Sequence, residues 1–304
     1  MAVNSTDLSP EAEAFLASCE RSDAPTDFSC ITEIRSETEA GFAAGAERAI
    51  VRHALIREDV EVAGIACERI SSARTQAPTG TLVYLFGGAF IVGCPHSDMP
   101  IIGALAEYCR VEIVAPKYRL APEYPAPCAS EDCMAVYREL AASTGRLLLA
   151  GESAGGNLAV LVAQRAVAEK IRVPDAMALL SPATDLRPSA HLFEPTRTLD
   201  PTLSPAAVSE VNTVYVADMD PCEPAVSPLF GEMRGLPPTI ITTGTRDMLM
   251  AMCLRFTRAL HRAGVDVDTR VWNGLWHVFE YYDEYPESAE SLREIAEFLN
   301  VKSP

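Results

Sequence analysis

The stretch LLLAGESAGGN, residues 147–157, determines the fold that we expect for this chain. An apolar run leads into the pentapeptide GESAG at 151–155, and a helix-like segment follows at 158–170. The pentapeptide alone also arises by chance, so its place between strand and helix carries the inference. A serine at the apex of such a turn adopts a strained backbone conformation and exposes its hydroxyl at the sheet edge. Ser153 is therefore the candidate nucleophile.

Short apolar runs bounded by turn residues alternate with helix-like segments along most of the chain. Such alternation predicts an α/β protein with a mostly parallel, doubly wound sheet and helices on both faces. The expected strands are 54–60, 65–70, 81–86, 111–115, 147–150, 177–180, 239–243 and 267–272. The expected core helices are 130–142, 158–170, 248–263 and 288–299.

Two segments depart from this alternation. Residues 1–50 are biased towards helix, with a helix start expected at Ser9-Pro10. Residues 185–236 carry seven prolines and at most one convincing helix, at 205–216. An insertion of that size is too long for an ordinary loop and is typical of a lid. We therefore expect a catalytic core of residues 51–184 and 237–304, with residues 1–50 and 185–236 together forming a helical cap.

Composition limits the classes of function. The 304 residues are 48% apolar, which suffices for a large core, yet no run is long enough to cross a bilayer. The first ten residues have no secretory pattern, and the nine cysteines are irregularly spaced without a C-x-x-C pair. A net charge of −17 disfavours nucleic acid and anionic lipid as partners. We expect a cytoplasmic protein, with homodimer formation left open.

A serine nucleophile needs a base to take its proton. Among five histidines, His277 follows the strand expected at 267–272 and would reach the same sheet edge as Ser153. The other histidines are interpreted as surface or structural groups. They are His53, His96, His191 and His261.

The base in turn needs a carboxylate that fixes its tautomer. Asp247 follows the strand expected at 239–243, and the chain order serine, aspartate, histidine is that of α/β-hydrolases. Asp266 and Asp268 are rivals, but they stand at the start of a strand and so at the opposite edge. The other interpretation of Asp247 is a helix cap.

The oxyanion of an acyl-transfer reaction needs backbone N–H donors. The amide of Ala154, next after the serine, would supply one. Gly87 and Gly88, which follow the strand at 81–86, would supply others. A simple Gly-Gly turn is the alternative for the glycine pair.

With these residues identified, positions 80–300 resemble the bacterial hormone-sensitive-lipase-like esterases of the α/β-hydrolase superfamily. YLFGGAFIVG at 84–93 stands where that family has its His-Gly-Gly-Gly stretch, YRLAPEYPAP at 118–127 is close to its usual text, and GESAGGN is its elbow. Ser181-Pro182, Ser227-Pro228-Leu229 and Trp276-His277 also agree. The resemblance implies a two-part cap and hydrolysis of short- to medium-chain carboxylic esters through an acyl-enzyme, with no metal and no cofactor.

The resemblance also has departures. Phe86 stands at the position of the family histidine and Ala89 at that of its third glycine, so the oxyanion loop is expected to be held differently from the usual arrangement. The Phe86 ring can only pack, and where packing does not fully replace the hydrogen bonds the loop is looser. The residues expected to line the substrate pocket are Phe86, Ala89, Phe90, Glu152 and Trp276. Related proteins include amide and lactone hydrolases and hormone receptors that do not hydrolyse. A pathway-specific lactone or amide hydrolase, an acyltransferase and a ligand-binding pseudo-hydrolase therefore remain as alternatives, although receptors of that kind typically lack the base.

Overall fold

An eight-stranded sheet forms the centre of the molecule, in the order β1-β2-β4-β3-β5-β6-β7-β8. The computed structural model describes residues 8–19, 27–142, 145–188, 196 and 199–303. β2 is antiparallel to both β1 and β4, and from β4 to β8 every neighbouring pair is parallel. The strands are β1 (Leu55–Val62), β2 (Ile65–Ser72), β3 (Gly80–Leu85), β4 (Glu112–Pro116), β5 (Arg146–Glu152), β6 (Ala176–Leu180), β7 (Thr239–Gly244) and β8 (Val267–Trp272). The predicted mostly parallel α/β fold is confirmed.

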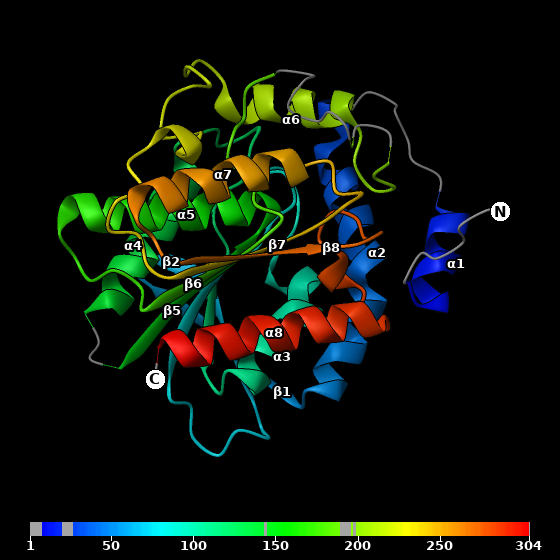
Figure 1. Ribbon diagram of the computed structural model, residues 1–304, viewed down its shortest axis with the longest axis horizontal. Helices are drawn as coiled ribbons and strands as arrows, with labels where there is room; N and C mark the ends of the chain where they lie inside the picture. Colours follow the sequence, from blue (N-terminus) through cyan, green and yellow to red (C-terminus); the bar gives the residue numbers. More distant parts are fainter. Residues whose placement is uncertain (1–7, 20–26, 143–144, 189–195, 197–198, 304) are drawn as a thin grey trace.

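Helices cover both faces of the sheet (Figure 1), so the central strands are buried on both sides and consist of apolar runs. On one face α4, α5 and α7 pack, and on the other α3 and α8 lie together. The helices are α1 (Pro10–Ser18), α2 (Ile31–Arg52), α3 (Met99–Tyr108), α4 (Cys128–Ala141), α5 (Ser153–Glu169), α6 (Pro205–Val216), α7 (Met250–Ala263) and α8 (Pro286–Lys302).

Two helices differ from the sequence-based expectation. Helix α3 was not predicted because its sequence, MPIIGALAEY, has no polar face, and eight of its ten residues are buried. Helix α5 begins at Ser153 rather than at 158, because Gly155 and Gly156, which resemble turn residues in sequence, lie inside its first turn. The helix thus starts at the candidate nucleophile itself.

The carboxyl ends of the parallel strands meet at one edge, and α1 and α2 lie beside that edge (Figure 1). Phe15 of α1 stacks on Trp276, with ring centroids 4.5 Å apart. Arg35 of α2 donates to the carbonyl oxygens of Ile91 and Ala121 at 2.8 and 2.9 Å. The N-terminal helices are therefore fixed to the loops that surround the candidate site.

The segment between β6 and β7 contains α6 as its main helix, as predicted. Tyr215 of α6 stacks face to face on Phe90, with centroids 3.7 Å apart, so this helix packs on the loop that follows β3. Residues 189–195 and 197–198, and with them the predicted surface histidine His191, lie outside the described residues.

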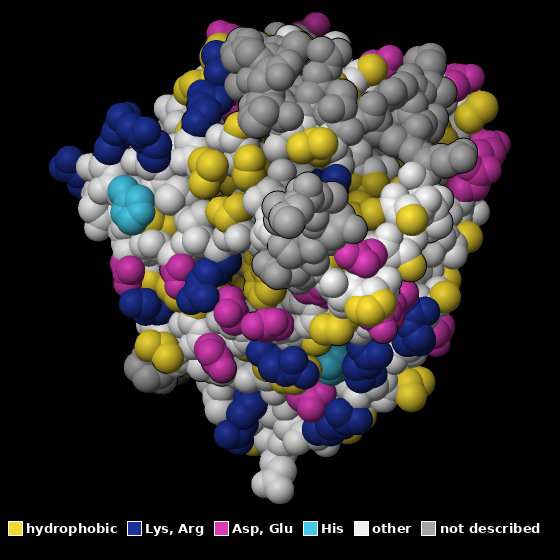
Figure 2. All heavy atoms as spheres, turned by 45° about the vertical axis from the view of Figure 1, so that its right-hand side comes forward, with side chains coloured by type: hydrophobic (Ala, Val, Ile, Leu, Met, Phe, Trp, Pro, Cys, Tyr) yellow, Lys and Arg dark blue, Asp and Glu magenta, His cyan; other side chains and the backbone are white. Residues whose placement is uncertain are grey.

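Surface charge and helix length bear on the expected partners. Acidic and basic side chains are interspersed over the described part of the face in Figure 2. Within the described ranges, none of the helices is both long and apolar enough to span a bilayer.

The elbow depends on close contact between two backbones. A Cβ atom on Gly155 would lie 1.9 Å from the carbonyl oxygen of Leu85 and 2.4 Å from that of Phe86. These are backbone atoms of the neighbouring strand and its following loop, so they cannot move aside without breaking the sheet. Gly155 therefore allows α5 to approach β3 closely enough for Ser153 to face the loop after β3.

We expect Gly155→Ala to lower the free energy of unfolding by more than about 3 kcal/mol, because the added methyl group overlaps fixed backbone atoms. Gly41→Ala in α2 is the matched control, since nothing lies within 4 Å of the position that its Cβ would occupy. That control should be neutral or stabilise the protein by up to about 1 kcal/mol. Urea unfolding of both variants measures the difference, and similar midpoints would contradict the account of the elbow.

Candidate active site

Ser153 stands at the junction of β5 and α5. Its φ angle is +51°, whereas Glu152 before it is extended. A non-glycine residue in this left-handed region is strained, and such strain persists only where the surrounding structure enforces it. The strained turn places the Ser153 hydroxyl at the carboxyl edge of the sheet, half-buried and next to two cavities.

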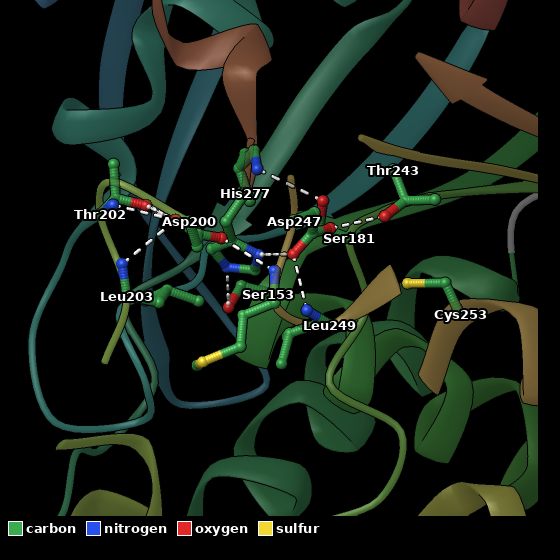
Figure 3. A network of polar contacts seen from close by, with 12 residues as sticks. Ser153, Ser181, Asp200, Thr202, Leu203, Thr243, Asp247, Leu249, Cys253 and His277 are labelled. Carbon is green, nitrogen blue, oxygen red and sulfur yellow. Dashed lines mark hydrogen bonds and ion pairs between the residues drawn. The ribbon is translucent and has the colours of Figure 1, made fainter. Parts of the chain in front are cut away.

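The structure brings together the three residues that sequence reasoning selected (Figure 3). His277 Nε2 lies 2.9 Å from Ser153 Oγ, and His277 Nδ1 lies 3.1 Å from Asp247 Oδ1. Asp247 is fully buried, and its Oδ2 accepts a hydrogen bond from the Thr243 hydroxyl at 2.6 Å. These contacts form a continuous relay from a buried carboxylate to an accessible hydroxyl.

The capping interpretation of Asp247 also describes a real contact. Asp247 Oδ1 accepts the backbone N–H of Leu249 at 2.8 Å, just before α7. One carboxylate therefore closes the turn and orients the imidazole. The rival aspartates pair elsewhere, Asp266 with Lys302 at 2.6 Å and Asp268 with Arg270 at 2.8 Å.

Charges around the imidazole change the protonation of both partners. Burial disfavours the imidazolium, but the carboxylates of Asp247, Asp200 and Glu280 outweigh it and raise the pKa of His277 above its ordinary value. Burial likewise opposes ionisation of Asp247, but the charge and hydrogen bond of His277 dominate and lower the pKa of Asp247. The pair therefore favours an ionised aspartate and a fairly basic imidazole.

The other described histidines have different partners. His53 Nδ1 lies 2.8 Å from Glu107, His96 lies 3.9 Å from Glu47, and His261 is in the last turn of α7. These positions agree with the structural interpretation from sequence.

The loop after β3 lies next to Ser153, across the cavity that both border. Phe86 stacks on Tyr118 with centroids 4.1 Å apart, and the Tyr118 hydroxyl donates to the Phe86 carbonyl oxygen at 2.6 Å. Gly88 and Ala89 then take φ values of +90° and +54°. Phe86 stands where the esterases that the sequence resembles have a histidine. Its packing on Tyr118 holds the first residue of the strained turn that follows.

Gly87 and Gly88 face different surroundings. A Cβ on Gly87 would lie 1.9 Å from Glu152 Oε1, so Gly87 packs directly against that side chain. Gly88 and Ala89, by contrast, line the cavity beside Ser153.

Two cavities meet at Ser153. The larger, of about 320 Å³, is bordered by His277, Glu152 and residues of α2 such as Thr38 and Phe42. The smaller, of about 40 Å³, is bordered mainly by apolar side chains. These include Phe90, Leu186, Val208, Val211, Leu249 and Met252.

The five residues expected to line the substrate pocket separate into two groups. Ala89 borders both cavities, Phe90 the smaller and Glu152 the larger. Phe86 and Trp276 border neither. Both are fully packed, Phe86 against Tyr118 and Trp276 between α1 and the tyrosines after β8, so they support the cavity wall from behind.

Sequence reasoning missed several buried acidic residues near the site, of which Asp98 and Asp200 are the first to consider. Asp98, before α3, accepts the Tyr84 hydroxyl at 2.8 Å behind Glu152, and burial followed by the charge of Asp98 raises the pKa of Glu152. Asp200, in the segment before α6, accepts the backbone N–H of Met248 at 2.9 Å. Both were hidden within stretches that show only turn or proline signals in sequence.

The described part of the chain contains no cluster of three or more histidine, cysteine or acidic side chains arranged to hold a metal ion. Its polar groups are instead arranged for proton transfer between a hydroxyl, an imidazole and a carboxylate.

Comparisons with known proteins identify the family of the chain. A family model described as the alpha/beta hydrolase fold matches residues 82–281. An esterase of Acinetobacter venetianus is 30% identical over 79% of this chain and 80% of its own length. An acetyl-hydrolase of Streptomyces hygroscopicus is 32% identical over 73% of this chain and 75% of its own length.

Solved structures give the same result. One match is the crystal structure of an esterase from the bacterial hormone-sensitive lipase family, whose sequence is 26% identical to this chain. The two structures superpose with a TM-score of 0.85 over 97% of this chain and 98% of the other. The chain therefore belongs to the α/β-hydrolase superfamily and, within it, to the bacterial hormone-sensitive-lipase-like esterases.

Proposed function

We propose that this protein hydrolyses carboxylic esters through an acyl-enzyme formed on Ser153. The supporting observation is the relay from Ser153 Oγ to His277 Nε2 at 2.9 Å and from His277 Nδ1 to Asp247 Oδ1 at 3.1 Å, next to a cavity. His277 accepts the serine proton as Oγ attacks the ester carbonyl, and then donates it to the leaving alcohol. Water, deprotonated by the same imidazole, releases the acid.

The oxyanion of each tetrahedral intermediate needs N–H donors close to Ser153 Oγ. We assign this role to the amides of Gly88, Ala89 and Ala154. Gly88 and Ala89 support the assignment because they border the cavity, and Ala154 because it follows the nucleophile in the first turn of α5. Gly87 packs against Glu152 and is assigned to holding the loop.

The two cavities suggest which part of an ester lies where. The leaving alcohol must take its proton from His277, which borders the 320 Å³ cavity and not the smaller one. The acyl group is then left to the 40 Å³ cavity. A water-sized group occupies roughly 10–15 Å³ by this measure, so the acyl side holds about three such groups.

We therefore propose short acyl chains, acetyl to butyryl, esterified to a larger alcohol. The similarity to an acetyl-hydrolase supports this choice. We also assign α2 and the segment around α6 to a cap, because Thr38 and Phe42 border the alcohol side and Val208 and Val211 border the acyl side. We assign α1 to the same cap because its Phe15 stacks on Trp276, next to His277.

Ser153→Ala and His277→Ala should each lower kcat by several orders of magnitude, and the double variant should be hardly slower than either one, because the residues act as a unit. Steady-state kinetics on a nitrophenyl acetate measures this. A fluorophosphonate probe should form one adduct on Ser153 in the unmodified protein. Multiplicative losses in the double variant, or labelling at another residue, would exclude the shared mechanism.

The pH dependence of kcat/KM follows from the direction of the pKa shift of His277. Only neutral imidazole accepts the serine proton, so activity is full at high pH and is lost as pH falls through the pKa of His277. Because that pKa is raised, the loss should be centred above the ordinary value of 6.5. The pKa of Asp247 is lowered, so its protonation should not contribute in this range. A midpoint below 6.5 would be inconsistent with the charges described here.

Acyl length gives a separate test. Each methylene beyond butyryl should lower kcat/KM by roughly tenfold, since an acyl pocket without spare volume rejects it. Val211→Ala removes side-chain volume from the wall that α6 contributes, so the smaller cavity grows and the optimum should move to longer acyl chains. Val214→Ala on the same helix is the control, because the Val214 side chain does not border that cavity, and it should leave the optimum unchanged. A series of nitrophenyl esters from acetate to octanoate, assayed on all three proteins, would refute the assignment if the optimum were hexanoate or longer in the unmodified protein.

A further inference from the structure

We propose that Asp200 is a positioning residue that fixes the loop carrying Asp247 and adds a second negative charge beside the imidazole of His277. This inference depends on the proposed function, because it gives Asp200 a role in the same proton relay. Asp200 belongs to the segment between β6 and β7, so the role joins the proposed cap to the chemistry of the core.

Both oxygens of the Asp200 carboxylate accept hydrogen bonds (Figure 3). Its Oδ2 accepts the backbone N–H of Met248 at 2.9 Å, and Met248 directly follows Asp247. Its Oδ1 accepts the N–H and hydroxyl of Thr202, each at 2.9 Å, and the N–H of Leu203 at 3.2 Å. The side chain is only 2% exposed, so all four donors depend on one buried group.

These hydrogen bonds connect the substrate wall with the relay. Leu203 borders both cavities at Ser153, and Thr202 borders the larger one. The Thr196 hydroxyl also donates to the Met248 carbonyl oxygen, at 3.3 Å, so the same segment contacts both polar groups of that residue. A shift of the segment would therefore move Met248, and with it Asp247.

Three carboxyl groups from three elements act on His277. Asp247 comes from the loop after β7, Asp200 from the segment before α6, and Glu280 from the short turn η5 (Phe279–Tyr281). Glu280 accepts the hydroxyls of Thr242 and Ser291 at 2.7 and 2.9 Å, and burial raises its pKa above the ordinary value.

Burial, the largest influence, keeps the pKa of Asp200 above its ordinary value, and a protonated His277 nearby shifts that pKa back down. The amide donors of Asp200 shift its pKa down as well. The two charged forms therefore stabilise each other, so Asp200 favours the imidazolium that forms when His277 takes the serine proton. A purely structural residue would hold the loop but would not change this proton affinity.

Asp200→Asn tests both parts of the role, because asparagine keeps one acceptor oxygen and removes the charge. If the asparagine oxygen accepts from Thr202 and Leu203, its NH2 group faces the N–H of Met248. Two donors then face each other, so the hydrogen bond to Met248 is lost. We expect kcat to fall on the order of tenfold with little change in KM, as for a relay held slightly out of place. The low-pH limb of kcat/KM should move to lower pH, because the imidazole loses a negative neighbour.

Two variants separate charge from structure. Asp200→Glu keeps the charge but displaces the carboxylate, so kcat should fall while the low-pH limb stays close to that of the unmodified protein. Ser204→Ala removes the hydroxyl that accepts the N–H of Ala207 at the start of α6, at 3.2 Å, without changing any charge. It should lower the midpoint of thermal unfolding and leave the low-pH limb in place.

The downfield imidazole N–H proton of His277, followed by NMR, gives the same titration without turnover. Its midpoint should be lower in Asp200→Asn than in the unmodified protein. If that variant does not fold, the amide of Met248 in the unmodified protein serves instead. Its chemical shift should titrate together with the imidazole proton, and a Met248 amide that is insensitive to pH would overturn the proposal.

The outcomes distinguish this inference from the proposed function. An unmoved low-pH limb and imidazole midpoint in Asp200→Asn, with Ser153→Ala inactive, would overturn the role of Asp200 alone. A Ser153→Ala variant that hydrolyses esters at the unmodified rate would overturn the proposed function itself. A loss in Asp200→Asn that Ser204→Ala reproduces in both kcat and pH profile would also overturn the charge-based role.

Discussion

The close approach of α5 to β3 at Gly155 is the constraint on which the site depends. Because this glycine lies against the carbonyl oxygens of Leu85 and Phe86, the first turn of α5 lies directly beside the loop that follows β3. Ser153 and the strained turn at Gly88 and Ala89 thereby come to border one cavity. No catalytic group has to reach across the sheet edge, since the backbone contact has already brought the nucleophile and the candidate oxyanion donors together.

Burial of charge around His277 is the second organising feature. The site holds Asp247 and Asp200 almost without solvent exposure, and such charges are tolerated only when hydrogen bonds or opposite charge compensate them. Thr243 and Leu249 donate to Asp247, and Met248, Thr202 and Leu203 donate to Asp200. Most of these donors are backbone amides, which only a substitution by proline would remove and which need little reorganisation during the reaction.

The sheet could be predicted from sequence because its central strands are short apolar runs, and the relay could be predicted because parallel strands bring their following loops to one edge. Helix α3 could not, because a helix buried on all sides has no amphipathic period. The sequence also did not reveal that Gly87 packs against Glu152 whereas Gly88 borders the cavity. This difference depends on the Glu152 side chain, which comes from a different strand and which no local pattern connects to the glycines. Asp200 was hidden similarly, since its partner Met248 lies 48 positions away.

The position of Leu203 shows why the substrate wall and the relay should not be treated as independent parts. Leu203 borders both the acyl and the alcohol cavity, and its backbone N–H is held by Asp200, whose other oxygen holds the residue after Asp247. Under the proposed placement, an ester that fills both cavities would contact Leu203 from two sides and so restrict the segment that carries Asp200. Binding energy from groups remote from the ester carbonyl can thus be used to order the acid–base pair, which raises kcat rather than only lowering KM. Under the same placement, a small ester that leaves the larger cavity empty would lack that contribution, even where its acyl group fits the smaller cavity.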